Sequence, residues 1–137
     1  MNNSLVPLAR WRFAKRLEAD GIAPLVRQSI EKIQVNVGKV CNQACLHCHV
    51  EAGPKRTEDM SEDVATRVME LFERTESASV LDITGGAPEL NANFRMMVRT
   101  ARALGREVID RCNLTVIFEE GMEDLPAFLA DNSVRVI

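Results

Sequence analysis

Three cysteines, Cys41, Cys45 and Cys48, stand close together in a C-x3-C-x2-C pattern directly after a strand-like run. Three thiolates at this spacing can each bind one iron of a cubic iron–sulfur cluster and leave the fourth iron without a protein ligand. A cluster that only carries electrons normally has four cysteine ligands. The spacing therefore predicts a cluster with one open iron, which is the arrangement needed to bind a substrate or cofactor.

A single zinc ion is the main alternative for this loop, with His47 or His49 as a fourth ligand. Structural zinc sites usually take two short ligand pairs from separate segments, and the chain has no second pair. The spacing therefore favours the cluster. His49 is interpreted either as a hydrogen-bond donor to a cluster sulfur or as a solvated side chain. A disulfide is less favoured still, because three of the four cysteines crowd into one loop.

The fourth cysteine, Cys112, lies far along the chain from the other three. Its thiol could face a substrate, and a soft thiolate would suit arsenic(III). A free cysteine in or near a strand is more often a small buried apolar residue, and we favour that interpretation.

Composition narrows the classes of function. The chain has 137 residues, of which 46% are hydrophobic and 27% charged, and its net charge is −3. These values are typical of one globular domain and supply no basic surface for nucleic acid. The sequence shows no apolar run of about 20 residues and no secretion signal. We therefore expect a cytoplasmic protein without a nucleic-acid or membrane partner.

Hydrophobic periodicity predicts strands that alternate with helices, and hence a parallel α/β sheet with right-handed crossovers. In the helix that follows Ser61, the buried stripe is expected to consist of Val64, Val68, Leu71 and Phe72. The expected strands are 30–37, 80–83, 107–110 and 134–137, and the expected helices are about 10–20, 61–74, 91–104 and a shorter one that holds Leu125, Phe128 and Leu129.

The last predicted strand runs to the end of the chain. A complete eight-fold α/β barrel takes about 250 residues, which is more than three and a half β-α units can supply. We therefore expect residues 30–137 to form the N-terminal part of the core domain of a larger enzyme, after a helical extension at residues 1–29. We expect this portion to be inactive by itself.

Three informative segments follow three predicted strands: the cysteine loop, Thr84 to Glu89, and Arg111 to Thr115. The carboxyl ends of parallel strands meet at one edge of a sheet, so these segments should converge there. Gly85 and Gly86 permit a tight turn that a ligand can approach, with carbonyls free to accept hydrogen bonds from an ammonium group. Asp82, inside the second strand, is expected to satisfy a neighbouring backbone or basic group.

The cysteine loop after a first strand, with Gly85-Gly86-Ala87-Pro88 after the second, resembles the radical S-adenosylmethionine (SAM) superfamily. Three longer strings are similar to the arsenosugar biosynthesis radical SAM protein (ArsS) group: Gln34 to Pro54, Thr84 to Asn91 and Asp110 to Thr115. The resemblance covers the chain from about Phe13 onward. It implies that the sheet is the first half of a partial, TIM-like barrel.

The resemblance also implies the cofactors and the reaction. Cys41, Cys45 and Cys48 would hold a [4Fe-4S] cluster whose open iron binds the amino and carboxylate groups of SAM. Reduction of the cluster by an electron donor such as flavodoxin or ferredoxin would cleave SAM to methionine and a 5′-deoxyadenosyl radical. In the arsenosugar group, the deoxyadenosyl moiety is joined to a methylated arsenical, which would be the small-molecule substrate.

Two positions depart from the usual superfamily pattern. His47 replaces an aromatic residue that packs on adenine, and its imidazole would take over that stacking. Ala87 replaces a common glutamate, so ammonium binding would fall to backbone carbonyls, helped by Glu89. The SAM contacts that the resemblance implies are His47, Thr84, Gly85, Gly86, Ala87, Pro88, Asn113 and Thr115.

Two other functions stay open from the sequence. The chain can belong to a radical SAM enzyme with another class of substrate, such as a peptide that it modifies. It can also be a non-catalytic module that binds zinc or a simple iron–sulfur cluster.

Overall fold

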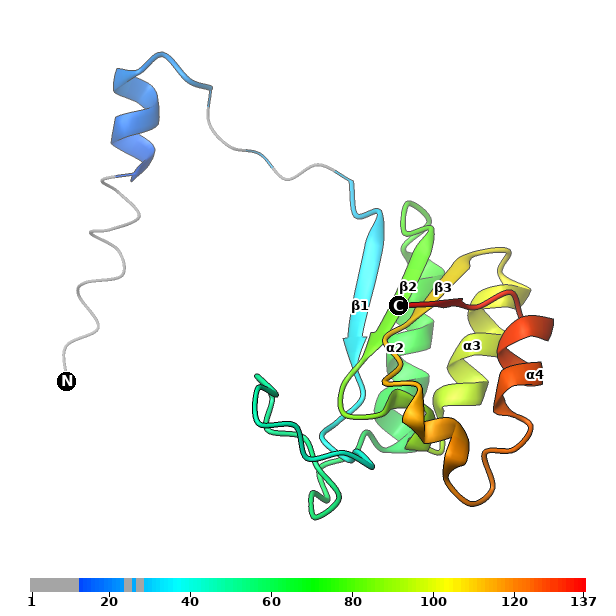
Figure 1. Cartoon of the computed structure of the whole chain (residues 1–137). Helices are drawn as coiled ribbons and strands as arrows, with labels where there is room; N and C mark the ends of the chain where they lie inside the picture. Colours follow the sequence, from blue (N-terminus) through cyan, green and yellow to red (C-terminus); the bar gives the residue numbers. More distant parts are fainter. Residues whose placement is uncertain (1–12, 24–25, 27–28) are drawn as a thin grey trace.

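Four parallel strands form one sheet in the order β1-β2-β3-β4 (Figure 1). The computed structural model describes residues 13–23, 26 and 29–137. The strands are β1 Lys32–Asn36, β2 Val80–Thr84, β3 Glu107–Asp110 and β4 Arg135–Val136. Alternating with them are α2 Glu62–Arg74, η1 Pro88–Leu90, α3 Phe94–Ala103, η2 Thr115–Phe118 and α4 Leu125–Asp131. The predicted α/β class and parallel topology are confirmed.

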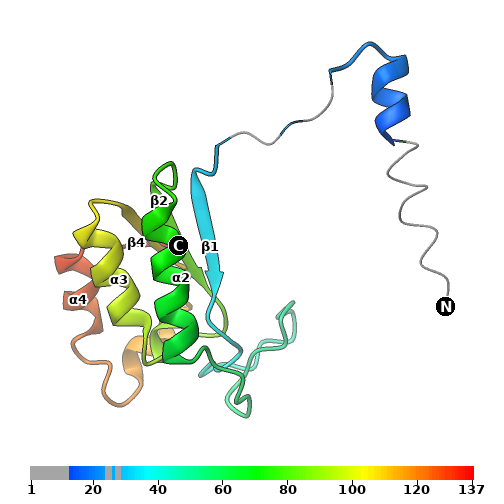
Figure 2. The same cartoon turned by 180° about the vertical axis from the view of Figure 1, so that it is seen from behind.

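The three helices α2, α3 and α4 cover one face of the sheet, as Figures 1 and 2 show from opposite sides. Side chains alternate between the two faces of a strand, so every second residue meets the helices. Val35, Leu81, Ile83 and Val108 supply this buried apolar layer. The opposite face carries polar side chains, because Gln34 is paired in register with Asp82 and both point away from the helices.

The buried stripe of α2 agrees with the prediction at Phe72 and in part at Val68, and differs elsewhere. Ala65, Met69 and Phe72 are buried, whereas Val64 and Leu71 are about half exposed. The apolar residues of this helix form a broad face, so periodicity alone allows more than one choice of buried stripe within it. Contact with the sheet selects the stripe that contains Ala65, since a small residue lets the helix approach the strands closely.

Helices α3 and α4 agree with the sequence-based expectation. Phe94, Met97, Val98 and Ala101 of α3 are buried, and so are Leu125, Phe128 and Leu129 of α4. The rings of Phe94 and Phe128 lie 6.4 Å apart, which joins the two helices. Leu104, expected in the same stripe, is only partly buried at the end of α3.

Residues 13–19 form a helix that ends before Gly21, which confirms the described part of the predicted N-terminal helix. The first three residues of that prediction, 10–12, lie outside the described residues. Phe13 is exposed in this helix. The division of the chain into an extension, 1–29, and a core, 30–137, stays a prediction.

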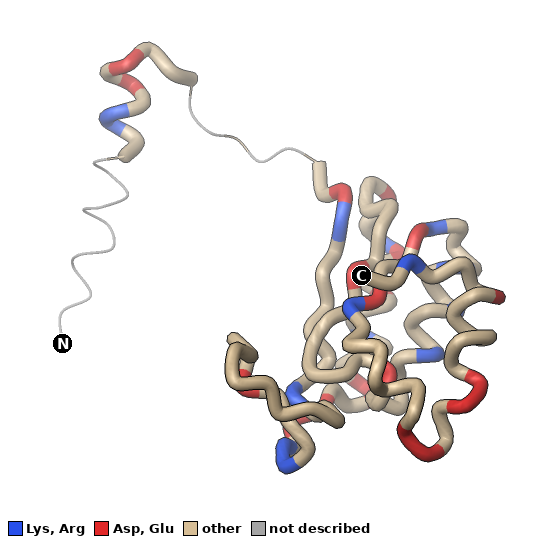
Figure 3. The backbone as a smooth tube through the Cα atoms, viewed as in Figure 1, with Lys and Arg blue, Asp and Glu red and all other residues tan. Residues whose placement is uncertain are grey.

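Charged residues of both signs are interspersed along the described chain (Figure 3). None of the described helices is long and apolar enough to cross a lipid bilayer.

Candidate functional site

The cysteine loop leaves the carboxyl end of β1 and is closed at its base by backbone hydrogen bonds. The Cys41 amide donates to the Gly53 carbonyl at 3.4 Å, and the Gly53 amide donates to the Lys39 carbonyl at 3.0 Å. All three cysteines of the loop are free thiols; Cys41 is buried, Cys45 is exposed and Cys48 is partly buried. The chain thus presents three thiols from one loop with fixed ends.

Backbone amides inside the loop donate to two of the sulfurs. The Gln43 amide lies 3.4 Å from Cys41 Sγ, and the Ala52 amide lies 3.3 Å from Cys48 Sγ. The amides of Ala52 and then Val50 lower the pKa of the Cys48 thiol. Metal ligands must be thiolates, and N–H donors stabilise that form, so the loop fits a metal cluster.

The loop does not hold a preassembled set of ligand atoms for a single ion in the described structure. In the described part of the chain, the one group of three or more His, Cys, Asp or Glu ligand atoms within 4.8 Å contains no residue of this loop. His47 and His49 are both exposed. Ligands of a single zinc ion must lie closer together than that, because each bond is about 2.0–2.3 Å long.

The glycine pair lies directly against the chain segment that leads into the cysteine loop. A Cβ atom on Gly86 would stand 2.0 Å from the Val40 carbonyl oxygen. The Gly86 amide donates to the Gly38 carbonyl at 3.0 Å, and the Ala87 amide donates to the Val40 carbonyl at 2.9 Å. The close approach at this turn is thus made by the chain's own backbone, and approach of a ligand stays a prediction.

The carbonyls of this turn differ in whether they already accept a backbone hydrogen bond. The Thr84 carbonyl accepts the Val37 amide at 2.9 Å, and the Ala87 carbonyl accepts the Leu90 amide at 3.1 Å. The carbonyls of Gly85 and Gly86 accept no hydrogen bond from any residue that the structure describes. They are the most available acceptors in the predicted ammonium-binding segment. Pro88, the last residue of that segment, is buried at the start of η1.

Asn113 and Thr115 hold the cysteine loop from the carboxyl end of β3. Thr115 Oγ1 accepts from Asn42 Nδ2 and from Gln43 Nε2, each at 2.9 Å. Asn113 Nδ2 donates to Asn42 Oδ1 at 2.8 Å and to Cys41 Sγ at 3.5 Å. This contact was not predicted from the sequence. The available signal was the pair of amide side chains, Asn42 and Gln43, between the first two cysteines. Contact of Asn113 and Thr115 with SAM stays a prediction.

A polar pocket of about 520 Å³ opens beside the loop, on the sheet face that the helices leave uncovered. It brings together Thr84 and Gly85, which the sequence analysis selected, and His49. His47 is not among the residues of this pocket, so its stacking role stays a prediction. The pocket is lined by Gln34, Asn36, His49, Val50, Thr84, Gly85 and Arg111.

Arg111, which lines this pocket, forms an ion pair with Asp82. Arg111 donates to both carboxylate oxygens of Asp82, from Nε at 2.8 Å and from Nη2 at 2.9 Å. Lys32 and Gln34 also approach this buried carboxylate, at 3.8 and 3.3 Å. Arg111 above all lowers the pKa of Asp82. The expectation that Asp82 satisfies a basic group is confirmed, and Arg111 is a pocket residue that sequence reasoning missed.

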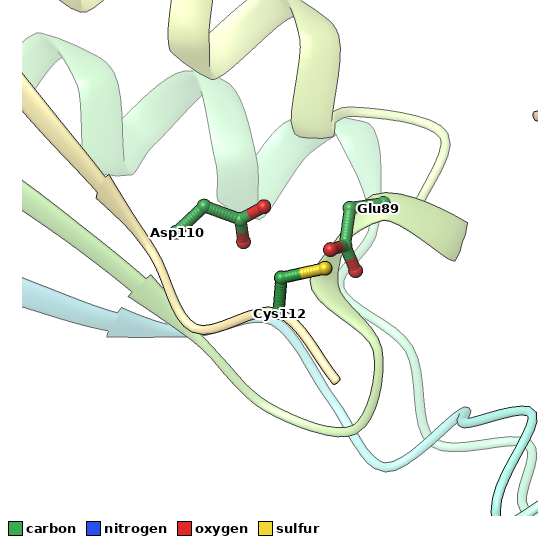
Figure 4. A group of neighbouring side chains, drawn as sticks. All are labelled: Glu89, Asp110 and Cys112. Carbon is green, nitrogen blue, oxygen red and sulfur yellow. The ribbon is translucent and has the colours of Figure 1, made fainter. Parts of the chain in front are cut away.

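A second polar group lies on the helix-covered face and was also missed. Glu89, Asp110 and Cys112 meet there, as Figure 4 shows. Glu89, expected to help bind the SAM ammonium, is only 3% exposed and belongs to this group. Burial, followed by the charge of Glu89, raises the pKa of Asp110 to about 9. Burial also raises the pKa of Cys112 to about 12. Cys112 packs against the core, as favoured from the sequence, although its neighbours are acidic.

Comparison with known proteins gives one family. The model of the radical SAM superfamily matches residues 35–135, from within β1 to β4. A search of curated proteins finds no match.

Proposed function

The chain belongs to the radical SAM superfamily, and from this premise we propose that Cys41, Cys45 and Cys48 hold a [4Fe-4S] cluster that binds SAM. The observation that carries the proposal is the position of the cysteine loop, which the glycine turn and the Asn113–Thr115 segment hold at the rim of a polar pocket. When bound, the reduced cluster and SAM supply one-electron cleavage of the sulfonium carbon–sulfur bond.

The chain's own residues would position the cofactor. The carbonyls of Gly85 and Gly86 would accept hydrogen bonds from the SAM ammonium, since the other two carbonyls of that turn already accept from the backbone. The imidazole of His47 would stack on adenine. Thr115 would keep the loop in place through Asn42 and Gln43, which limits the movement of the cysteine ligands.

The proposed substrate is a methylated arsenical that receives the deoxyadenosyl group. This assignment is supported by the resemblance of Gln34 to Pro54, Thr84 to Asn91 and Asp110 to Thr115 to the arsenosugar group. The partner would be a cytoplasmic one-electron donor such as flavodoxin or ferredoxin.

Anaerobic reconstitution with iron and sulfide tests the cofactor assignment. We expect about four irons per chain and, after reduction, an electron paramagnetic resonance (EPR) signal. Bound zinc without iron would overturn the assignment and favour a structural metal module.

A turnover assay tests the substrate. The reduced protein is incubated with SAM and a dimethylated arsenic(III) compound, and products are identified by mass spectrometry. We expect an arsenical that carries the deoxyadenosyl group. SAM cleavage to free 5′-deoxyadenosine without this product would contradict the arsenical and leave the cofactor assignment intact.

A further inference from the structure

Glu89, Asp110 and Cys112 bring three potential ligand atoms together from two segments. Glu89 lies in η1, Asp110 ends β3, and Cys112 follows β3 by two residues. A carboxylate oxygen from each acid and the Cys112 sulfur lie within 4.8 Å of one another. Figure 4 shows the three side chains directed into one space between the strand end and η1.

The two carboxylates are buried without partners. Glu89 is 3% exposed and Asp110 is fully buried. None of their four oxygens has a hydrogen-bond partner in the described structure. Buried polar groups are almost always hydrogen-bonded, since leaving one unpaired costs more free energy than a formed hydrogen bond contributes. Two such acids side by side indicate that the site lacks a partner that compensates the carboxylates.

No basic side chain in the described part of the chain neutralises this group. The nearest arginine in sequence, Arg111, points to the other face of the sheet and is bound by Asp82. A proton shared between the two acids, with the thiol donating to Glu89, leaves one Asp110 oxygen without a donor. A divalent cation compensates both carboxylates at once.

We propose that Glu89, Asp110 and Cys112 bind one divalent transition-metal ion, separate from the cysteine loop. Two hard oxygens and one soft sulfur are a donor set for a borderline ion such as Zn²⁺, Co²⁺ or Fe²⁺. Neighbouring ligand atoms around a tetrahedral ion are roughly 3.5 Å apart. Side-chain rotations that move these ligand atoms by about 1 Å would bring them to that spacing. The fourth position falls to water, because Cys112 is only partly buried.

Such an ion would brace the segment that holds the cysteine loop. Cys112 is followed at once by Asn113, and Asn113 contacts both Cys41 and Asn42. Fixing the start of this segment to η1 would restrain Asn113 and Thr115. The site would therefore act on the cluster loop through position, with no ligand in common.

Metal titration of the whole chain tests the proposal, with Co²⁺ and Zn²⁺ as the probes. Cys41, Cys45 and Cys48 are first changed together to Ser, so that the loop cannot bind the probe. We expect one equivalent of Co²⁺ with thiolate-to-cobalt charge-transfer absorption, which Zn²⁺ displaces. Glu89→Gln and Asp110→Asn should each weaken binding by more than the 10–100-fold that loss of a second-shell partner causes. Cys112→Ser should remove the absorption, and exposed Glu120→Gln should change neither.

Failure to bind Co²⁺, or binding that survives all three substitutions, would overturn the proposal and leave a shared proton in the site. If the triple Ser background is unfolded by circular dichroism, wild type is loaded with its cluster and zinc is counted by mass spectrometry. One zinc in addition to the iron, lost in Cys112→Ser, supports the site; equal zinc in both contradicts it.

Discussion

Asp82 and Asp110 are both buried in neighbouring strands, and they lie on opposite faces of the same sheet. Asp82 faces the open side, where Arg111, Lys32 and Gln34 surround it and its pKa is lowered. Asp110 faces the helices, where it meets another acid and its pKa is raised to about 9. Position in the sheet therefore does not decide what a buried aspartate does; its partners do.

The two faces of the sheet also differ in the function that they can support. The open face offers paired charges, a polar pocket and the cysteine loop at its rim, which together suit a bound cofactor. The covered face is apolar except for the Glu89 group, which lacks its compensating charge. The two faces should therefore respond differently to matched substitutions.

The largest contrast should come from the cysteines. Replacing Cys41, Cys45 or Cys48 by Ala removes one of three cluster ligands, and each change should abolish the cluster EPR signal and most bound iron. Cys112→Ala is the matched change on the covered face; it removes no cluster ligand, so the cluster EPR signal should be retained. Iron retained in all three loop variants would remove the functional distinction between the two faces.

Glycine substitutions should show how closely the turn after β2 supports the loop. In Gly86→Ala the new methyl group would collide with the Val40 carbonyl, so we expect a loss of about 3 kcal/mol and poor cluster assembly. Gly121→Ala has open space and only a positive φ of +82°, so it should cost about 1 kcal/mol. Chemical denaturation measures both. Equal losses would mean that the turn does not support the loop.

Substituting the two aspartates tests directly whether Asp82 and Asp110 differ in their environments. Asp82→Asn leaves Arg111 and Lys32 without their carboxylate, and we expect a loss of about 2 kcal/mol at pH 7. Because the folded pKa of Asp82 is lowered, its contribution is present above the ordinary value and is lost as the pH falls through the folded one. The deficit of the variant should therefore shrink in acid.

Asp110→Asn is the control for that experiment, measured in metal-free protein. Because its pKa is raised to about 9, Asp110 is already neutral at pH 7, so the amide replaces a protonated carboxyl and thermal unfolding should show little or no loss of stability. Losses of equal size for the two variants would contradict the assignment of their environments.

The smallest effect should come from Thr115→Val, which removes the hydroxyl that accepts from Asn42 and Gln43. We expect a loss of about 1 kcal/mol, measured by denaturation, and a shifted reduction potential of the assembled cluster. Thr115→Ser keeps the hydroxyl and should restore the potential. A reduction potential unchanged in Thr115→Val would show that the hydrogen bonds of Thr115 with Asn42 and Gln43 have no influence on the cluster.

Much of the fold could be predicted because its signals are local. The strand Glu107–Asp110 and the buried residues of α3 follow from short apolar patterns ended by Gly105 and polar loops. The stripe of α2 could be predicted only in part, at Phe72 and Val68, since only contact with the sheet selects Ala65 and Met69 over Val64 and Leu71.

The site could be predicted only in part, for a similar reason. The three cysteines lie within one loop, so their spacing can be read from the sequence. The hydrogen bond between Asn42 and Thr115 joins residues 73 positions apart. The same limit applies to Glu89 and Asp110. Glu89 lies in the middle of η1 and Asp110 ends β3, and only the packing of η1 against β3 makes them neighbours.

The most direct test of the account is the EPR spectrum of the reduced, reconstituted protein with and without SAM. The account predicts a four-iron cluster signal whose shape and g values change when SAM is added, because SAM binds the iron that has no cysteine ligand. An iron-loaded protein with the same spectrum in the presence and absence of SAM would contradict it.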